Sequence, residues 1–271
     1  MLMGIVNVND DSFSGDGTLD FGKAAELARR QIAQGADCID VGAESARTNR
    51  VVIPVGEEIR RFHGFIERWD EVLEGLSPRD EAQVWPPVLS ANTWRPEVVE
   101  AVLAGGNVEL INDMSALPEE RNARFCADHR AALLIMHSVG EPKIPHLTQQ
   151  WDDVMGAMLE FFERKIGLAM AAGLPREAIL LDPGIDFAKQ RDDNLTVYQN
   201  LARLRCFERP LLVPVSRKTV IGEVLGQTDP CDRDPGTISC ISAAMRRGAE
   251  MFRVHNVDAA WQAVKVLHEL G

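Results

Sequence analysis

Ile179-Leu180-Leu181-Asp182-Pro183-Gly184-Ile185 is the stretch that decides the fold. A continuous Ile/Leu run bounded by turn residues is typical of a parallel strand that is covered on both faces. Asp182 ends the run and precedes Pro-Gly, so its side chain is expected at the carboxyl end of the strand. The stretch therefore predicts a buried strand that stops on a carboxylate.

The same alternation of short apolar runs and longer amphipathic segments fills the chain of 271 residues. No linker or shift in composition interrupts it, so one domain over residues 1–271 is expected. Eight runs, each followed by a helical segment, predict an α/β fold of the TIM (β/α)8 barrel type. The expected strands are 2–7, 37–42, 87–92, 108–112, 131–137, 178–182, 210–216 and 250–255.

The helical segments have recognisable ends. The first is expected to start near Asp20 and to stop at Gly35, and the longest covers about 150–173. An open doubly wound sheet is the rival architecture. Because no GxGxxG follows the first expected strand, a dinucleotide-binding fold is the weaker interpretation.

Composition excludes several classes of protein. A formal net charge of −12 opposes a broad nucleic-acid surface, which needs clustered Lys and Arg to replace phosphate counterions. No apolar stretch approaches the roughly 20 residues of a membrane helix. Met1-Leu2-Met3-Gly4-Ile5 lacks the features of a signal peptide, and five cysteines without CxxC spacing argue against disulfides and zinc. These features predict a cytoplasmic protein that binds neither nucleic acid nor membrane.

Polar residues end most of the apolar runs, where a TIM barrel carries its active site. Each could instead cap the next helix, so only the set as a whole indicates a site. The set is Asn7, Arg47 (in the loop after the second strand), Asn92, Asn112-Asp113, His137, Asp182, Ser216-Arg217-Lys218 and Arg253-Val254-His255.

Two chemical groups are present in this set. Asn92, Asn112 and Asp182 could read the donor and acceptor edge of a flat, nitrogen-rich heterocycle. The second group could hold a phosphate or pyrophosphate, with help from a helix start just after the lysine. It consists of Arg47, Lys218, Arg253 and His255. Together they indicate a heterocycle with an anionic leaving group.

Several short motifs, in this order, resemble those of the dihydropteroate synthase family over nearly the whole chain. They are Gly4-Ile5-Val6-Asn7-Val8, Asp11-Ser12-Phe13, Gly42-Ala43-Glu44-Ser45-Ala46-Arg47, Ile111-Asn112-Asp113, Met136-His137, Asp182-Pro183-Gly184, Ser216-Arg217-Lys218 and Arg253-Val254-His255. The resemblance implies a pterin-binding TIM barrel that joins 6-hydroxymethyl-7,8-dihydropterin pyrophosphate to 4-aminobenzoate. Dihydropteroate and pyrophosphate would be the products, with Mg²⁺ as cofactor.

The resemblance also implies roles for individual residues. Pterin contacts would come from Asn92, Asn112, Met136, Asp182 and Lys218. Pyrophosphate and its metal would be bound by Asn7, Arg47, Arg253 and His255, with Asn7 as the metal ligand. Phe187, Lys218 and Thr219 would line the aminobenzoate pocket, and Thr219 and the helix start could meet its carboxylate. The expected catalytic residues are Arg47, Lys218, Arg253 and His255. A homodimer through the last helices, about 233–248 and 258–270, is a further implication.

The chain departs from the family pattern at several points. Asn9-Asp10 replaces Thr-Pro, Ser45-Ala46-Arg47-Thr48-Asn49 replaces Ser-Thr-Arg-Pro-Gly, and Asn92 replaces Asp. Asp186 and Ala188 stand where glycines are usual. These departures keep a second hypothesis open, a paralogue that binds pterin without catalysis.

A third hypothesis is a methyltransferase that moves a methyl group from methyltetrahydrofolate to a corrinoid protein. The cations of Ser216-Arg217-Lys218 and Arg253-Val254-His255 speak against it, because a methyl donor has no pyrophosphate to bind.

Overall fold

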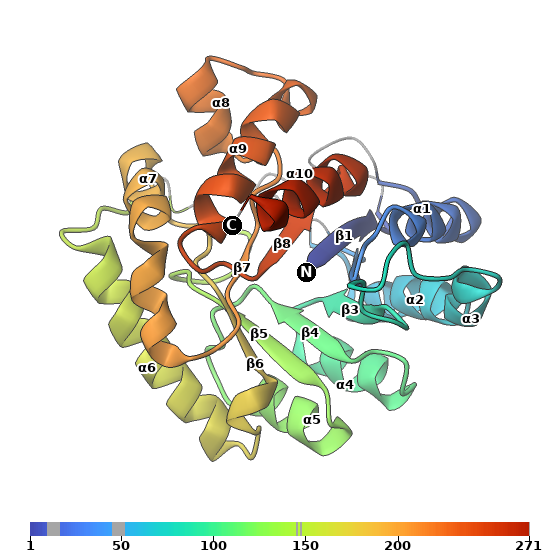
Figure 1. Ribbon diagram of the computed structural model, residues 1–271. Coiled ribbons are helices and arrows are strands. Elements are labelled where there is room, and N and C mark those ends of the chain that lie inside the picture. Colours follow the sequence, from blue (N-terminus) through green and yellow to red (C-terminus); the bar gives the residue numbers. More distant parts are fainter. Residues whose placement is uncertain (10–16, 45–51, 145, 147, 271) are drawn as a thin grey trace.

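The computed structural model describes residues 1–9, 17–44, 52–144, 146 and 148–270. Its centre is an eight-stranded parallel sheet in the order β6-β5-β4-β3-β2-β1-β8-β7, with helices outside it (Figure 1). This is the predicted TIM (β/α)8 barrel. The strands are β1 Leu2–Asn7, β2 Cys38–Gly42, β3 Val88–Asn92, β4 Leu110–Asp113, β5 Ala132–Met136, β6 Ile179–Asp182, β7 Leu212–Val213 and β8 Met251–Val254.

The barrel closes between β6 and β7. In the described residues these strands are joined by an isolated bridge between Leu181 and Leu211, and Leu181 N donates to Pro210 O at 3.0 Å. β7 is much shorter than the expected strand 210–216. Pro210 and Pro214 flank it, and a proline has no N–H for the strand ladder.

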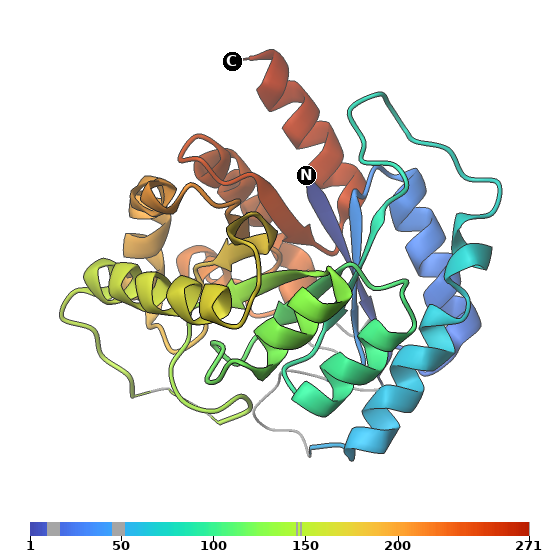
Figure 2. The same cartoon turned by 90° about the horizontal axis from the view of Figure 1, so that it is seen from below.

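The helices form the outer layer, which Figure 1 shows as a ring around the strands and Figure 2 shows from below, with helices in front of and beside the strands. They are α1 Phe21–Ala33, α2 Val55–Ile66, α3 Trp69–Leu73, α4 Pro96–Ala104, α5 Arg121–His129, α6 Val154–Ala171, α7 Arg191–Asn200, α8 Thr219–Leu225, α9 Asp234–Met245 and α10 Val257–Glu269, with 3₁₀ turns Arg176–Ala178, Leu201–Phe207 and Pro230–Arg233.

Helix boundaries follow the sequence signals. Asp20 caps α1, because its Oδ1 accepts from Gly22 N at 3.0 Å and Lys23 N at 3.2 Å, and Asp153 caps α6 in the same way through Gly156 N. The long helix predicted over 150–173 is α6. None of the helices in the described ranges has the length and apolar character needed to cross a membrane.

Two apolar clusters form the core. The larger lies between the strands and the helices and includes Phe62, Phe65, Phe162 and Phe252. The smaller comes from alternate strand residues and fills the inside of the barrel below the carboxyl ends. Its buried members are Met3, Cys38, Leu110, Leu134, Leu212 and Met251. Because this apolar cluster fills the lower part of the barrel, polar side chains can occupy the space at the carboxyl ends of the strands.

Candidate active site

Four neighbouring strands bring a row of residues together at their carboxyl ends. Strand register pairs Asn7 with Gly42, Gly42 with Asn92, and Asn92 with Asn112. A Cβ at Gly42 would lie 3.5 Å from Asn7 Oδ1 and 4.0 Å from Asn92 Cβ. Gly42 therefore lies between the two amides, and the three predicted Asn residues form one wall of the site.

Asp40, on β2, lies below this row and is fully buried. Its Oδ1 accepts from Ser90 Oγ at 2.6 Å. Its Oδ2 accepts from Asn92 Nδ2 at 3.2 Å, Asn112 Nδ2 at 3.0 Å and Arg253 Nε at 2.7 Å. One carboxylate thus joins side chains from β3, β4 and β8.

Asp182 ends β6 inside the barrel and is 4% exposed. Its Oδ1 accepts from Gly184 N at 2.7 Å in a tight turn. Gly184 has φ 63°, and a Cβ there would lie 2.0 Å from the His137 carbonyl oxygen, so only glycine fits. Burial raises the pKa of Asp182 to about 6, against the opposing effects of the Gly184 N–H and of Lys218, Lys189 and Arg253. Asp182 therefore lies in the electrostatic range of these three cations.

Lys218 precedes α8 and reaches the loop that follows β6. Its Nζ donates to Ile185 O at 2.9 Å and lies 5.0 Å from the centre of the Phe187 ring. Burial lowers the pKa of Lys218, although Asp186 and Asp182 oppose that shift. The cation and the aromatic ring thus form one surface beside Asp182.

Lys189 binds backbone carbonyl groups of the loop after β6 and of the end of β5. Its Nζ donates to the carbonyl oxygens of His137, Gly184 and Phe187 at 3.3, 3.0 and 3.1 Å. Burial lowers the pKa of Lys189 to about 7, and Asp182 is the strongest opposing charge. These bonds fix the backbone on both sides of Phe187.

Arg253 and His255 lie on the β8 side. Arg253 lies in β8 and His255 directly follows its last residue, so alternation along this extended segment turns both toward the barrel interior, as expected for Arg-x-His. Ser216 Oγ lies 2.8 Å from His255 Nδ1 and accepts from His255 N at 3.2 Å. The side chain of Arg253 is 20% exposed, so it extends from Asp40 toward the mouth.

Three strand-end residues belong elsewhere. His137 packs on Trp151, Phe161 and Phe162 outside the barrel, and burial lowers its pKa to about 2, so it is a neutral core residue. Asp113 also points outward, where it accepts from Ser115 and Asn122. Their grouping with the site was wrong, because alternation directs Met136 and Asn112 inward in their place.

Arg217 is the third strand-end residue that lies outside the site. Its Nε and Nη2 donate to the carboxylate of Asp234, the first residue of α9, at 2.8 and 3.2 Å. Thr237 Oγ1 accepts from the Arg217 backbone N–H at 3.0 Å. These contacts tie the residue to α9 and away from Asp182.

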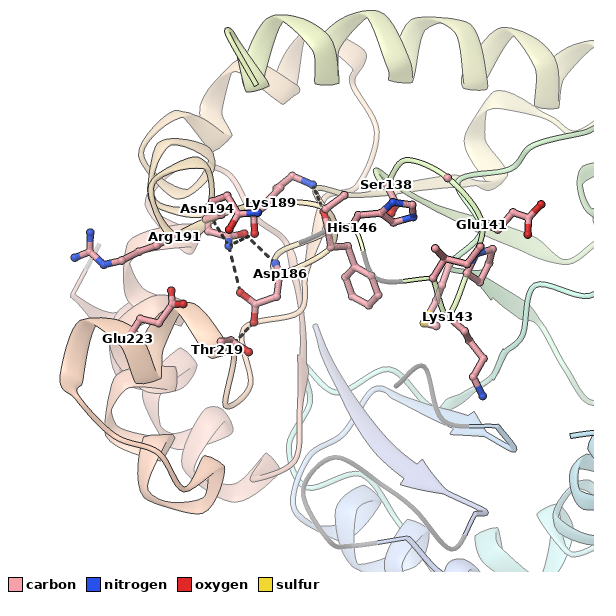
Figure 3. A pocket seen from close by; sticks show the side chains of 17 residues that line it. Ser138, Glu141, Lys143, His146, Asp186, Lys189, Arg191, Asn194, Thr219 and Glu223 are labelled. Carbon is pink, nitrogen blue, oxygen red and sulfur yellow. Dashed lines mark hydrogen bonds between the residues drawn. The ribbon is translucent and has the colours of Figure 1, made fainter. Parts of the chain in front are cut away.

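Asp186 occupies the start of α8. Its Oδ2 accepts from Thr219 N at 2.5 Å and its Oδ1 from Val220 N at 3.3 Å. Asn194 clamps the residue from α7, since Asn194 Oδ1 accepts from Asp186 N at 2.9 Å (Figure 3). The helix start was expected to meet a ligand carboxylate, and in this structure it meets a carboxylate of the protein.

A cavity of about 390 Å³ lies beside this contact. Its wall combines the loop after β5 with the loop after β6 and the start of α8 (Figure 3). Its charged lining includes Glu141, Lys143, Asp186, Lys189 and Glu223. The Phe187 side of the site therefore opens into a pocket of mixed charge.

Two loop residues have left-handed backbones. Asp186 has φ 68° and Ala188 has φ 50°, the region that favours glycine. Asp tolerates this region better than Ala, because its short polar side chain can bond locally. The strain therefore falls mainly on Ala188.

A buried charge network supports the loop after β2. Glu44 pairs with Arg95 and, at 2.7 Å, with Lys143 from the loop after β5. Arg95 also contacts Glu58 at 3.1 Å, and Glu58 accepts from Thr93 Oγ1 at 2.7 Å. The network thus connects the loops that follow β2, β3 and β5.

The structure brings together most of the predicted site. Asn7, Asn92, Asn112, Met136, Asp182, Arg253 and His255 lie at the carboxyl ends of the strands, and Phe187, Lys218 and Thr219 lie in the loop after β6 and at the start of α8 beside Asp182. Arg47, Asp11-Ser12-Phe13 and the loop 45–49 lie outside the described residues. Residue patterns missed Asp40 and Lys189. Asp40 interrupts the apolar run Cys38-Ile39-Asp40-Val41-Gly42. Because it is two residues from Cys38, its side chain points to the same side of the strand, into the barrel, and this spacing could have identified it as a site residue.

Comparison with known proteins gives a consistent set of relatives. A model of the family "Pterin binding enzyme" matches residues 3–255. The dihydropteroate synthase of Neisseria meningitidis serogroup C is 34% identical over 274 residues, covering 100% of this chain and 92% of that protein.

Solved structures agree. The Yersinia pestis dihydropteroate synthase, in a sulfonamide drug complex, superposes with a TM-score of 0.87 at 31% identity, covering 100% of this chain and 93% of that one. The Xanthomonas albilineans enzyme, in complex with 7,8-dihydropteroate, gives 0.81 at 32% identity, covering 99% and 92%.

Proposed function

The chain belongs to the dihydropteroate synthase family of pterin-binding enzymes, and on that premise we propose how its residues perform the reaction. It is a transferase of the dihydropteroate synthase type. The reaction joins 6-hydroxymethyl-7,8-dihydropterin pyrophosphate to 4-aminobenzoate. The C–O bond to pyrophosphate breaks, a C–N bond to the amine forms, and the amine loses a proton.

The pterin is assigned to the inside of the barrel. The observation that supports this assignment is the buried Asp182 carboxylate at the end of β6, within the electrostatic influence of three cations. A carboxylate there can accept two parallel N–H bonds from a guanidine-like edge. Asn92 and Asn112 face the same space from β3 and β4, and Met136, which pairs with Asp182 in register, adds an apolar contact.

The pyrophosphate is assigned to the cations nearer the mouth. Lys218 and Arg253 lie within electrostatic range of Asp182, His255 follows β8 two residues after Arg253, and Arg47 is proposed as a fourth from its place in the sequence. Positive charge stabilises a leaving group as its negative charge grows. The electron-rich pterin can carry the cation that its methylene carbon then acquires. The protein needs no nucleophile of its own.

The amine is assigned to the Phe187 and Thr219 side. Phe187 lies under Lys218 and borders the cavity, so an aromatic amine could stack there with its nitrogen toward the pterin. The carboxylate of aminobenzoate would approach Thr219, where Asp186 already accepts two N–H bonds.

Magnesium suits the donors at this end of the barrel. Asn7 Oδ1 is a hard oxygen donor beside Gly42, and in the described ranges no cluster of three His, Cys, Asp or Glu side chains could hold a metal alone. Mg²⁺ commonly binds through few protein ligands together with substrate phosphates. Bound there, it would neutralise charge on the departing pyrophosphate. Asn7 is therefore the proposed protein ligand.

Three further properties are proposed from the family. Residues 1–271 form one pterin-binding domain, the protein works in the cytoplasm, and it is a homodimer through α9 and α10. Val266 of α10 and Leu270, which caps it, are 57% and 73% exposed, which suits a helix that a second copy covers. Sedimentation of the full chain would test the dimer, and a monomer at micromolar concentration would reject it.

Activity is tested with purified protein, pterin pyrophosphate, 4-aminobenzoate and Mg²⁺. Dihydropteroate is the expected product, and heat-treated protein is the control. Pterin binding without any product would favour the non-catalytic paralogue. Methyl transfer from methyltetrahydrofolate to a corrinoid protein would favour the methyltransferase.

A further inference from the structure

Asp40 accepts hydrogen bonds from four side chains inside the barrel and has no role in the proposed reaction. Its carboxylate accepts from four side chains on three other strands, and its exposed fraction is 0%. Three of the four donors, from Asn92, Asn112 and Arg253, are residues of the proposed site. A buried carboxylate with this set of partners is placed to control how they face a ligand.

The two amides illustrate this control. An ionised carboxylate can only accept, so each amide must turn its Nδ2 toward Asp40. Asn92 Nδ2 and Asn112 Nδ2 both donate to the same oxygen, Oδ2. The Oδ1 atoms of both amides must then face away from Asp40. An amide without such a partner could take either orientation.

We propose that Asp40 is a positioning residue that makes Asn92 and Asn112 acceptors for N–H groups of the pterin. This role rests on the proposed function, and it deepens it by assigning the polarity of the recognition edge. Asn92 offers one acceptor, Asn112 offers another, and Asp182 supplies the carboxylate. The pocket therefore selects a flat heterocycle that is rich in N–H donors along this edge.

The same contact explains why an amide can stand at position 92. Asn92 Nδ2 lies 3.2 Å from Asp40 Oδ2. The amide donates to that oxygen and still presents its own oxygen to the ligand. Asn92 thus keeps the acceptor function that an aspartate would supply, without adding a second charge beside Asp40.

Asp40 also connects the heterocycle end to the anion end. Arg253 Nε donates to the oxygen that holds both amides, at 2.7 Å. A bond through Nε fixes the plane of the guanidinium and directs its other edge away from Asp40. The carboxylate therefore orients the pterin acceptors and the pyrophosphate cation together.

Asp40→Asn is the variant that tests the role, in the full chain, with 6-hydroxymethyl-7,8-dihydropterin as the probe in calorimetry. The amide at position 40 is neutral and can turn either its oxygen or its Nδ2 toward Asn92 and Asn112, so it no longer fixes the orientation of the two side chains. We expect the Kd for the pterin to rise by about 10- to 30-fold, the loss of one to two hydrogen bonds. Equal affinities for the variant and the parent protein would overturn the role of Asp40 alone. Absence of pterin binding by the parent protein would reject the proposed function as well.

Asp37→Asn is the matched control. Asp37 is a buried carboxylate just before β2 that accepts from Leu2 N at 2.6 Å and Val84 N at 2.8 Å, both backbone groups. Both variants should lower the melting temperature, and only Asp40→Asn should weaken pterin binding. Equal weakening by both would indicate that Asp40 is merely structural.

A ligand complex gives the same answer if Asp40→Asn does not fold. A crystal of the parent protein soaked with 6-hydroxymethyl-7,8-dihydropterin should place Asn92 Oδ1 and Asn112 Oδ1 within hydrogen-bond distance of N–H groups of the ligand. Their Nδ2 atoms should remain on Asp40. Contacts from either Nδ2 to the ligand, or a ligand without contact to both Oδ1 atoms, would overturn the proposal.

Discussion

The carboxylate of Asp186 lies 2.5 Å from the backbone nitrogen of Thr219, so the loop after β6 is bonded to the start of α8. Val220 N donates to the other oxygen at 3.3 Å. A substrate carboxylate that approaches Thr219 therefore meets a fixed negative charge. This arrangement bears directly on the affinity for aminobenzoate.

Asp186→Asn should improve aminobenzoate binding. The amide keeps an acceptor for Thr219 N and tolerates the left-handed backbone, but it removes the charge. A like charge some 8 Å away costs about 1 kcal/mol, so the KM for aminobenzoate should fall about five-fold with little change in kcat. Steady-state kinetics measure this, and Asp192→Asn, an exposed acid paired with Arg191, is the control. An unchanged KM for Asp186→Asn would show that this charge does not face the amine substrate.

Pterin affinity should depend on pH through Asp182. The ionised carboxylate accepts the N–H bonds, and its pKa in the folded protein is about 6. Below that pH the carboxyl gains a proton, so the affinity should fall about ten-fold for each further unit. Calorimetry with 6-hydroxymethylpterin between pH 5 and pH 8 is the measurement. Asp182→Asn should bind weakly and show no such inflection, and a flat profile in the parent protein would contradict the assignment.

The same carboxylate should lower stability at neutral pH. Its pKa is higher in the folded state than the ordinary 3.8, so the folded state binds more protons between pH 4 and pH 6 and gains stability as pH falls. At pH 8 the ionised group is therefore a net cost. Asp182→Asn keeps the acceptor for Gly184 N and should raise the free energy of unfolding by about 3 kcal/mol at pH 8. Urea unfolding should show no gain near pH 4, and a destabilised variant at pH 8 would refute the cause.

Ala188→Gly should stabilise the protein. Ala188 has φ 50°, where a Cβ is unfavourable, so glycine should raise the free energy of unfolding by about 1 kcal/mol. Ala171→Gly, at an exposed position at the end of α6, should lower it by a similar amount. Chemical denaturation of the two variants compares them, and a loss of stability in Ala188→Gly would show that its methyl group packs usefully.

The sequence predicted the barrel well because buried parallel strands are continuous apolar runs. All eight expected strands overlap observed ones, and β7 is short where prolines interrupt it. Side-chain direction was harder to predict. Asn112 and Asp113 are adjacent polar residues, yet the first faces the site and the second bonds to α5. The contact of Asp186 with Thr219 joins residues 33 positions apart, and no local pattern encodes such a pairing.

In the part of the chain that the structure describes, an isolated bridge closes the barrel between β6 and β7, and this affects how often the two strands separate locally. A seam with few backbone bonds should open more often than the other strand pairs, so the amide protons of Leu181 and Leu211 should exchange early with deuterated solvent. Asp182 stands on one side of this seam and Lys218 on the other. A ligand that contacts both residues would hold β6 and β7 together. Slower amide exchange at Leu181 and Leu211 would then show that the site is occupied, without any assay of turnover.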